Sequence, residues 1–319
     1  MKAAVYRENG PPTVLSYEEV PDPVCDPHGI VIRNEAISIE GGDTLSRLAV
    51  TPLEIPYVVG YQAAGEIIEV GAQVRHLRVG DRVTTVHSHG SHAELRAVPA
   101  RNAWRIPPGM DIRMAAAIPI PFGTADECLF EFGQLAPGQT VLVQAGASAL
   151  GLAAVQLAKR AGATVLASAS SDAKLTRLRE FGVDHGVNYR TEDLVQQVRK
   201  FTGNRGVNLV VDPVGTTMRL RVACLAQRGR AVLVGRAGRE PVSIDPGMLM
   251  AGNQSITGVW LGAEMAGDRV HDMIQRHIHD VAAGKLAAVI DSEFPLREAA
   301  RAHARIESRQ AFGRVVLIP

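Results

Sequence analysis

The sequence VLVQAGASALGLAAVQLAKRAGATVLAS, residues 141–168, constrains the fold of this chain more than any other stretch. A short apolar run is followed by a turn of small residues, then by a helical pattern, and then by a second apolar run. This order predicts a strand, a tight turn, a helix and another strand. No charged residue occurs between residues 132 and 158, but Pro137, the glycines and the glutamines interrupt this stretch and argue against a membrane span.

Short apolar runs alternate with helical patterns throughout the region after residue 139. Strands are expected at 140–144, 164–168, 187–189, 208–211, 231–234 and 255–259, and helices at 150–160, 172–181, 192–201 and through Met218 and Val222. Such alternation predicts an α/β domain with a parallel sheet covered by helices. The first hundred or so residues instead show short β segments between Gly- and Pro-rich turns, which is typical of antiparallel structure.

Composition excludes several classes of protein. Hydrophobic residues make up 46% of the chain, and 34 Lys and Arg balance 33 Asp and Glu, which argues against a disordered or nucleic-acid-binding protein. Cys25, Cys128 and Cys224 lie far apart with no CxxC pair, so neither a disulfide scaffold nor a zinc knuckle is indicated. The first ten residues lack the apolar stretch of an export signal. We therefore expect a cytoplasmic protein with no membrane or nucleic-acid partner.

The small-residue turn has the chemistry of a dinucleotide-binding loop. A pyrophosphate is bound by backbone N–H groups at the start of a helix, where side chains must be small enough for close approach. Gly146, Ala147, Ser148, Ala149 and Gly151 meet this requirement. The match to GxGxxG is imperfect because Ser148 replaces the middle glycine. An ordinary tight turn is the alternative, and the preceding strand and following helix favour the nucleotide-binding interpretation.

The chain as a whole resembles the zinc-independent quinone oxidoreductases (zeta-crystallin type) of the medium-chain dehydrogenase/reductase superfamily. The resemblance runs nearly end to end and is carried by KAAVYRENGPPTVLSYEEVPDP, VGYQAAGEIIEVGAQVRHLRVGDRV, FGTADECL, AGASALGLAAVQLAKRAGATV, GVNYRTEDL, VVDPVG and SRQAFGRVVLIP. The usual loop of that family reads AxxGGVG, whereas here Ser148 and Ala149 replace the glycine pair.

The resemblance implies a GroES-like distorted β-barrel domain, residues 1–116 and 257–319, and a doubly wound Rossmann domain, residues 117–256, with the active cleft between them. It also implies a dimer or a tetramer, of which we expect a homodimer, and the strand at residues 254–259 is the segment to examine. The residues expected to contact the cofactor are Thr124, Gly146, Ala147, Ser148, Ala149, Leu150, Gly151, Ser170, Lys174, Tyr189, Gly235 and Val259.

The resemblance implies NADPH as the hydride donor, with Lys174 and Tyr189 at the positions that bind its 2′-phosphate. The neutral small residues that end the second strand, followed by Lys174, suit a phosphate better than a ribose hydroxyl. Asp172 is the competing observation, because an acid near this point can bind the ribose of NADH. The alternative role of Asp172, as a favourable carboxylate in the first turn of a helix, is the preferred interpretation.

The resemblance also implies a site without zinc. The positions that carry a cysteine and a GHE motif in the zinc alcohol dehydrogenases are Glu40 and Gly60, Tyr61 and Gln62 here, which lack the sulfur and imidazole ligands that zinc prefers. His87, His89 and His92 are an alternative metal site, since alternate residues of a strand share one face. We prefer a solvent-exposed β edge and turn for this histidine run.

The expected acceptor pocket contains Glu40, Asp43, Leu45, Thr124 and Trp260. Asp43 and Thr124 match the family, whereas Glu40 and Leu45 replace an Asn and an aromatic residue. The alternative interpretation of Glu40 is an exposed acid in a turn, and that of Trp260 is a half-buried packing residue. Without a Lewis acid, hydride is transferred most readily to a quinone or an activated enone. Solvent can supply the proton, so no catalytic residue is predicted. The alternatives are an enoyl-thioester reductase and a non-catalytic nucleotide-binding or structural protein.

Overall fold

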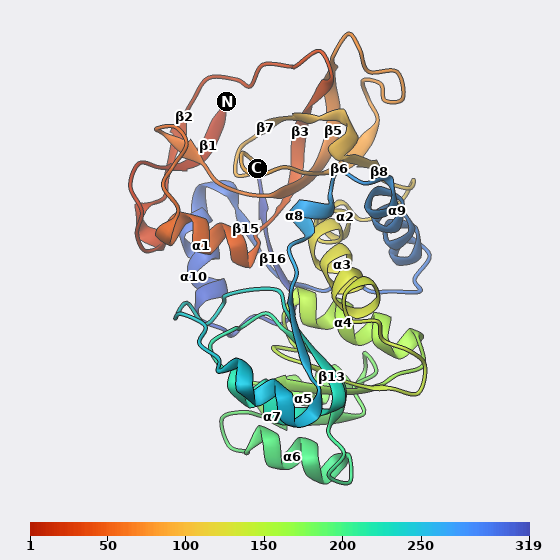
Figure 1. Ribbon diagram of the computed structural model, residues 1–319. Coiled ribbons are helices and arrows are strands. Elements are labelled where there is room, and N and C mark those ends of the chain that lie inside the picture. The colour runs from red at the N-terminus through yellow and green to blue at the C-terminus, as the bar shows by residue number, and fades with distance from the viewer. The chain divides into compact units, whose positions relative to one another are not determined.

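The computed structural model describes all 319 residues, which form two compact units (Figure 1). Unit 1 consists of Met1–Ile120 and Met265–Pro319, and unit 2 of Pro121–Glu264. Both ends of the chain therefore belong to unit 1. The domain limits implied by the resemblance, residues 1–116 with 257–319 and residues 117–256, stay a prediction. None of the helices combines the length and the apolar character that crossing a membrane requires.

Unit 2 contains a six-stranded sheet in which each strand runs parallel to its neighbours, in the order β11-β10-β9-β12-β13-β14. Its strands are β9 (Thr140–Val143), β10 (Thr164–Ala169), β11 (His185–Asn188), β12 (Val207–Asp212), β13 (Leu225–Leu233) and β14 (Ser255–Gly258). This is the order of a Rossmann fold, and it reverses between β9 and β12, where such sheets bind dinucleotides. The predicted doubly wound α/β architecture is confirmed.

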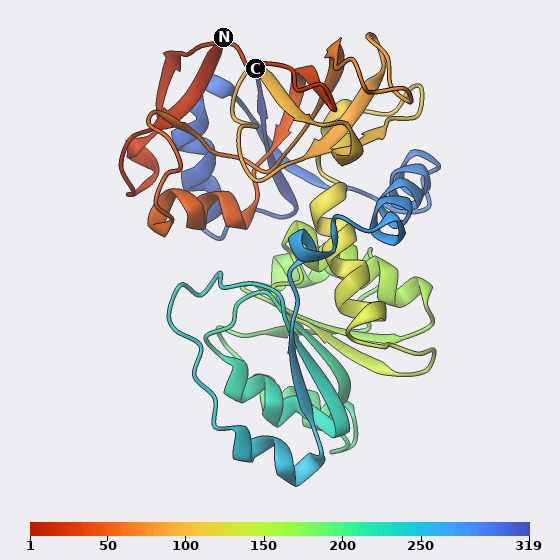
Figure 2. The same ribbon diagram turned by 45° about the horizontal axis from the view of Figure 1, so that its top comes forward.

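Helices lie on both faces of this sheet (Figure 2). The helices that contact its strands are α4 (Ala149–Arg160), α5 (Asp172–Arg179), α6 (Leu194–Phe201) and α7 (Met218–Cys224), whereas α3 (Pro119–Asp126) and α8 (Leu261–Glu264) stand at the beginning and the end of the segment that forms unit 2. Leu194 and Val198, one helical turn apart on α6, are buried in one core with Met218 of α7 and Leu142 of β9. The helix α6 begins two residues later than expected because Asp193 caps it, accepting a hydrogen bond from the Gln196 amide at 2.9 Å.

Unit 1 contains a seven-stranded sheet, β15-β16-β3-β5-β6-β8 with β7 also paired to β3, and a three-stranded sheet, β2-β1-β4. The strands are β1 (Lys2–Tyr6), β2 (Ser16–Glu19), β3 (Gly29–Ser38), β4 (Tyr57–Val58), β5 (Gln62–Val70), β6 (Arg82–Val86), β7 (Leu95–Pro99), β8 (Ala103–Arg105), β15 (Ile290–Pro295) and β16 (Arg314–Ile318). All pairs are antiparallel except β15 with β16.

Strand β3 decides which segments meet in unit 1. Along one edge it pairs with β5, and along the other its first half pairs with β7 and its last residues with β16. Two register shifts against β5 accompany this change of partner. As a result Ser38, at the end of β3, is opposite Val316, and the beginning of the last strand lies beside the residues that follow β3.

The helices of unit 1 complete its cores. They are α1 (Gly41–Ala49), α2 (Ile112–Ala116), α9 (Asp268–Ala282) and α10 (Ala299–Glu307). Ala299 and Ala302 of α10 are buried with Ile37 of β3 and with Val315 and Leu317 of β16. A separate core contains Ile30, Ile32 and Ile67 between β3 and β5. The small alanines let α10 approach the sheet closely, which places the C-terminal helix next to the end of β3.

Candidate active site

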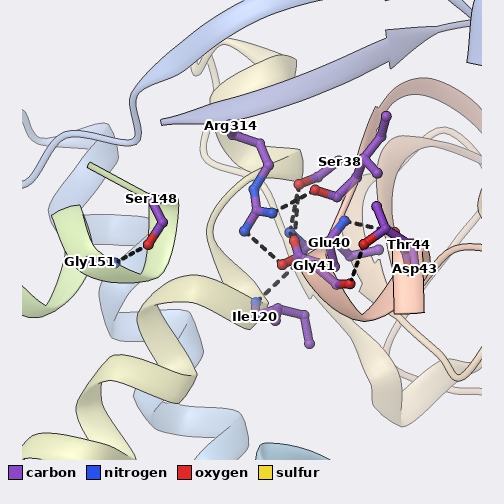
Figure 3. A network of polar contacts seen from close by, with 11 residues as sticks. Ser38, Glu40, Gly41, Asp43, Thr44, Ile120, Ser148, Gly151 and Arg314 are labelled. Carbon is purple, nitrogen blue, oxygen red and sulfur yellow. Dashed lines mark hydrogen bonds and ion pairs between the residues drawn. The ribbon is translucent and has the colours of Figure 1, made fainter. Parts of the chain in front are cut away.

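The predicted dinucleotide loop joins β9 to α4 in unit 2. Ser148 is the N-cap of α4, and its Oγ accepts a hydrogen bond from the Gly151 amide at 3.0 Å (Figure 3). The amides of Ala149 and Leu150, in the first turn of this helix, donate to no acceptor within the chain. Two backbone donors are thus directed out of the start of a 12-residue helix, which fits a pyrophosphate. Ser148 therefore performs a helix-capping role that a glycine there lacks.

The two glycines of this loop are required by its own packing. A Cβ on Gly146 would lie 2.9 Å from the Cβ of Ala167 on β10, and a Cβ on Gly151 would lie 2.4 Å from the carbonyl oxygen of Ala145. Ala145 itself has a φ of 50°, a left-handed conformation that tightens the turn. Small residues here allow the loop to pack closely against β10 and against the preceding residue Ala145.

The predicted 2′-phosphate residues follow the neighbouring strands. Ser170 comes directly after β10, and the Tyr189 amide donates to the Ala169 carbonyl at 3.2 Å, so Tyr189 lies beside it. Lys174 is in the first turn of α5, where its amide donates to Ser171 Oγ at 3.4 Å. Because the sheet is parallel, these residues share the edge that holds the α4 loop.

Asp172 also lies in the first turn of α5, and its side chain is engaged by the protein. The Asn188 Nδ2 donates to Asp172 Oδ1 at 2.9 Å. The carboxylate therefore stabilises the start of the helix and connects it to β11. This arrangement favours the helix-turn role over ribose binding.

The other predicted residues of unit 2 occupy different positions. Gly235 follows β13 and Val259 follows β14 at the same carboxyl edge, and the Val259 amide donates to the Leu233 carbonyl at 2.9 Å. Thr124 is buried on α3. The side chain of Trp260 is not packed, since the residue is 76% exposed, so the alternative of a half-buried packing residue is wrong.

Glu40 and Asp43, two of the predicted pocket residues, belong to a buried ionic network at the end of β3 (Figure 3). Glu40 is only 5% exposed, and its Oε2 lies 2.7 Å from Nη2 of Arg314. The other oxygen, Oε1, accepts hydrogen bonds from Gln62 Nε2 at 2.6 Å and from Ser38 Oγ at 3.2 Å. Burial raises the pKa of Glu40, and the Arg314 guanidinium opposes that shift. The alternative of an exposed turn acid is wrong.

Gln62 extends this network to α3. Its Oε1 accepts a hydrogen bond from the Ile120 amide at 2.9 Å, while its Nε2 donates to Glu40. Arg314 Nη1 also donates to the Ile39 carbonyl at 2.6 Å. Arg314 and Gln62 therefore fix the Glu40 carboxylate from two strands.

Asp43 lies next to Glu40 in the first turn of α1. Its Oδ2 accepts the Glu40 amide at 2.7 Å, and its Oδ1 is buried without a partner. Desolvation and the nearby Glu40 charge raise the pKa of Asp43 to about 8. Leu45, on the same helix, is half-buried. A neutral, protonated Asp43 beside the Glu40–Arg314 ion pair is consistent with this burial.

Arg96 of β7 is a buried cation that organises the neighbouring loops. Its Nη2 donates to the carbonyls of Tyr61 at 2.7 Å, His89 at 2.9 Å and His87 at 3.1 Å, and the residue is 1% exposed. The solvent-exposed edge expected for the histidine run was therefore wrong: His92 is fully buried, and His87 and His89 are half-buried. Desolvation and the Arg96 charge lower the pKa of His87 to about 4.

Comparison with known proteins identifies the family. Residues 26–108 match the alcohol dehydrogenase GroES-like domain, and residues 149–276 match the zinc-binding dehydrogenase family. The chain is 33% identical to a 2-haloacrylate reductase from Burkholderia sp over 99% of its length and 98% of the relative's. It is 30% identical to a quinone oxidoreductase from Pseudomonas aeruginosa, with 97% of each chain covered.

The solved structure of the Escherichia coli quinone oxidoreductase complexed with NADPH superposes with a TM-score of 0.96, at 28% identity, over the whole of both chains. The chain belongs to the quinone oxidoreductase family of the medium-chain dehydrogenase/reductase superfamily. It is accordingly an oxidoreductase, and the α/β fold with a GroES-like domain is confirmed.

For this quinone oxidoreductase family member, the residues at the positions of a catalytic zinc do not suit the metal. Glu40 is bound to a guanidinium, and the Tyr61 hydroxyl is hydrogen-bonded to Ser46 Oγ at 3.1 Å. A cation cannot share the Glu40 carboxylate with Arg314 without strong repulsion. No cluster of three or more His, Cys, Asp or Glu side chains is placed to hold a metal ion.

Sequence reasoning missed Arg314, Gln62 and Arg96. Arg314 was not singled out, and Gln62 was named only as one of the positions that replace the GHE motif. No local pattern reveals their role, because an arginine on a strand is usually exposed. Only the pairing of β16 with the end of β3 brings Arg314 to Glu40.

Proposed function

We propose that this protein is an NADPH-dependent, metal-free oxidoreductase that transfers hydride to quinones or related α,β-unsaturated carbonyls. The observation that carries the proposal is the start of α4, where the Ala149 and Leu150 amides lack acceptors and the turn before them is built of small residues. Ala147 and Ser148 line the same turn. These backbone donors are suited to bind the diphosphate of a dinucleotide.

The choice of NADPH rests on the neighbouring strand ends. Lys174 and Tyr189 lie where β10 and β11 end, and Ser170 and Ser171 add hydroxyl groups there. A lysine and hydroxyl groups suit the 2′-phosphate, whereas Asp172 is already bound to Asn188. A relative of the same fold was solved with NADPH, which supports the same choice here.

The metal-free part of the proposal rests on Glu40. Its carboxylate is occupied by Arg314, Gln62 and Ser38, so it serves neither as a zinc ligand nor as an exposed base. The ion pair also neutralises the charge of Glu40, which removes the repulsion that a free carboxylate would exert on an anionic acceptor. One relative is named 2-haloacrylate reductase, and 2-haloacrylate is an α,β-unsaturated carboxylate.

NADPH supplies the hydride when it is bound. The contribution of the chain is to hold the diphosphate at α4, to select the phosphorylated ribose with Lys174, and to orient the acceptor, so that an encounter of two molecules becomes effectively intramolecular. Hydride addition to an enone or a quinone leaves an oxyanion or enolate, and the proton that completes the reaction comes from solvent. No general acid of the protein is required.

An acceptor panel tests the proposal. Purified protein is incubated with NADPH and, in separate assays, a benzoquinone, 2-chloroacrylate, a neutral enone and an enoyl thioester, and NADPH oxidation is followed at fixed enzyme concentration. Turnover of the quinone or the enones supports the proposal, and turnover of the thioester alone replaces it with an enoyl-thioester reductase. Tight NADPH binding by calorimetry with no turnover of any acceptor would contradict it.

We also propose that the protein acts as a cytoplasmic homodimer. All three cysteines are free, and Cys128 and Cys224 are buried, as suits a reducing compartment. The edge strand β14, with Ser255 and Gly258 exposed, is available for pairing with a second copy. Light scattering coupled to size-exclusion chromatography tests the dimer, and a mass of one chain would contradict it; fractionation of the source cells tests the location.

A further inference from the structure

A row of buried polar side chains crosses unit 1 beside the predicted acceptor pocket. It consists of Arg47 on α1, His303 on α10, and His92 and Ser91 in the segment between β6 and β7. Each of the four is 0% exposed. Polar side chains buried this deeply are retained only where their hydrogen bonds are satisfied, so the row calls for an explanation.

The hydrogen bonds of the row determine where each imidazole proton lies. Arg47 Nε donates to His303 Nδ1 at 3.3 Å, and because Arg47 is only a donor, His303 Nδ1 is unprotonated. His303 is then protonated on Nε2 and donates to His92 Nε2 at 3.0 Å. His92 in turn carries its proton on Nδ1 and donates to Ser91 Oγ at 3.2 Å. We call these four residues the histidine relay.

A further proton cannot be added to the relay without breaking it. A proton on His303 Nδ1 would face the Arg47 N–H, and a proton on His92 Nε2 would face the His303 N–H, so either change sets a donor against a donor. The two rings contact each other edge to face, with centroids 5.1 Å apart. Both histidines are therefore held neutral.

The charged groups around the relay act in the same direction. Arg47 lies against His303, and desolvation together with the Arg96 charge lowers the pKa of His92 to about 3. Glu307 of α10 is paired with Arg47, and Asp43 of α1 has its pKa raised to about 8 and is neutral in acid, so neither group offsets the cost of charging an imidazole.

The relay ends against the segment that holds the network around Glu40. The amides of Ser91 and His92 donate to the carbonyls of Gly60 at 3.2 Å and Val59 at 3.0 Å. A Cβ on Gly60 would lie 1.9 Å from Ser91 Oγ and 2.2 Å from His92 Nδ1, so the two segments are in direct contact. Gln62, two residues further along, is hydrogen-bonded to Glu40.

We propose that the histidine relay positions the Gly60–Gln62 segment, and through Gln62 the carboxylate of Glu40, by a chain of fixed imidazole tautomers that only neutral histidines can form. Acid therefore loosens this part of unit 1. The relay itself follows from unit 1 alone, whereas its effect on acceptor binding rests on the proposed function.

The first test measures folding stability against pH. Below about pH 6.5, where free imidazoles gain protons, the unfolded chain takes up protons that the folded relay refuses, so the stability contributed by the relay falls with acid. The relay should lower the folding equilibrium constant by up to about tenfold per pH unit for each histidine, against the opposite contribution of Asp43, whose pKa is raised. His303→Gln keeps an N–H near the Nε2 position but has no titrating ring. Its folding equilibrium constant should therefore lack the factor of up to about ten per pH unit that one histidine contributes in the wild type. The control Arg301→Gln, on the exposed face of α10, should keep the wild-type slope. Equal slopes for the wild type and His303→Gln would overturn the proposal.

The second test needs no variant and is independent of turnover. Nitrogen-15 NMR of the histidine rings should show His303 protonated on Nε2 and His92 on Nδ1, with both rings neutral down to pH 5.5. The opposite tautomers, or a charged ring above that pH, would overturn the relay.

The third test addresses positioning. His92→Gln should raise the KM for the acceptor by roughly tenfold while changing the KM for NADPH by less than about twofold, because the relay contacts the segment around Glu40 and not the α4 loop. Equal changes in both constants would show a general structural role. If the wild type turns over no acceptor, the proposed function fails, and the NMR and pH results still decide the relay.

Discussion

Replacing Arg314 tests the central observation of the candidate site, the buried ion pair with Glu40. The two side chains are 9% and 7% exposed, with 2.7 Å between Nη2 and Oε2. Arg314→Met leaves the Glu40 carboxylate buried with only Gln62 and Ser38 as donors. Breaking one side of such a pair costs about 3–5 kcal/mol, so we expect that loss of unfolding free energy at pH 8. The loss should shrink as the pH falls, because a proton then neutralises Glu40.

The double variant distinguishes charge from packing. Glu40→Gln alone should cost about 1–3 kcal/mol, since Arg314 keeps its bond to the Ile39 carbonyl. Glu40→Gln with Arg314→Met removes both charges, and it should lie within about 1 kcal/mol of the wild type. The coupling energy should therefore exceed about 2 kcal/mol. The exposed pair Arg7–Glu18, treated in the same way, should show little coupling.

Urea unfolding provides the assay. A Trp260→Phe background leaves Trp104, which is 1% exposed in unit 1, as the fluorescent reporter. Midpoints that shift at a constant m value report changes in stability alone. If the double variant loses as much unfolding free energy as the two single variants together, the reasoning is refuted. Such additivity would show that the two charges do not depend on each other.

Further predictions concern the cofactor, pH and backbone. Lys174→Ala should weaken NADPH binding by about 1.5–3 kcal/mol in calorimetry and leave NADH binding nearly unchanged, because one charge-assisted bond is lost; equal losses would contradict the assignment. The folded pKa of Asp43 is raised to about 8, so the stability that this group contributes should decline as the pH rises from about 4 to 8, by at most about 1.4 kcal/mol per pH unit. Asp43→Asn should remove that decline in urea titrations between pH 7 and 8, and an unchanged slope would count against a protonated Asp43. Gly60→Ala should lower the unfolding free energy by about 3 kcal/mol or more, because φ is 116° at this position and the new Cβ would meet Ser91 and His92. A melting temperature equal to that of the wild type would show that the turn relaxes to accept the methyl group.

The architecture of unit 2 could be predicted because each of its signals is local. The small residues from Gly146 to Gly151 indicate the turn between β9 and α4, and alternating apolar runs indicate the remaining strands and helices. Right-handed crossovers then leave few possible strand orders. Even the helix-capping role of Ser148 is a local interaction, three residues from its donor.

The polar interior of unit 1 could not be predicted in this way. Glu40 and His92 belong to segments whose composition fits exposed turns, and their partners Arg314 and His303 are far along the chain: Arg314 is 275 residues from Ile39, to which it is also hydrogen-bonded, and His303 is 211 residues from His92. A charged or polar side chain is buried only if its partners are brought to it, and here β16 and α10 supply them by packing on β3. Local preferences determine which backbone segments form, whereas the free energy of burying a charge depends on groups that meet only in the folded unit.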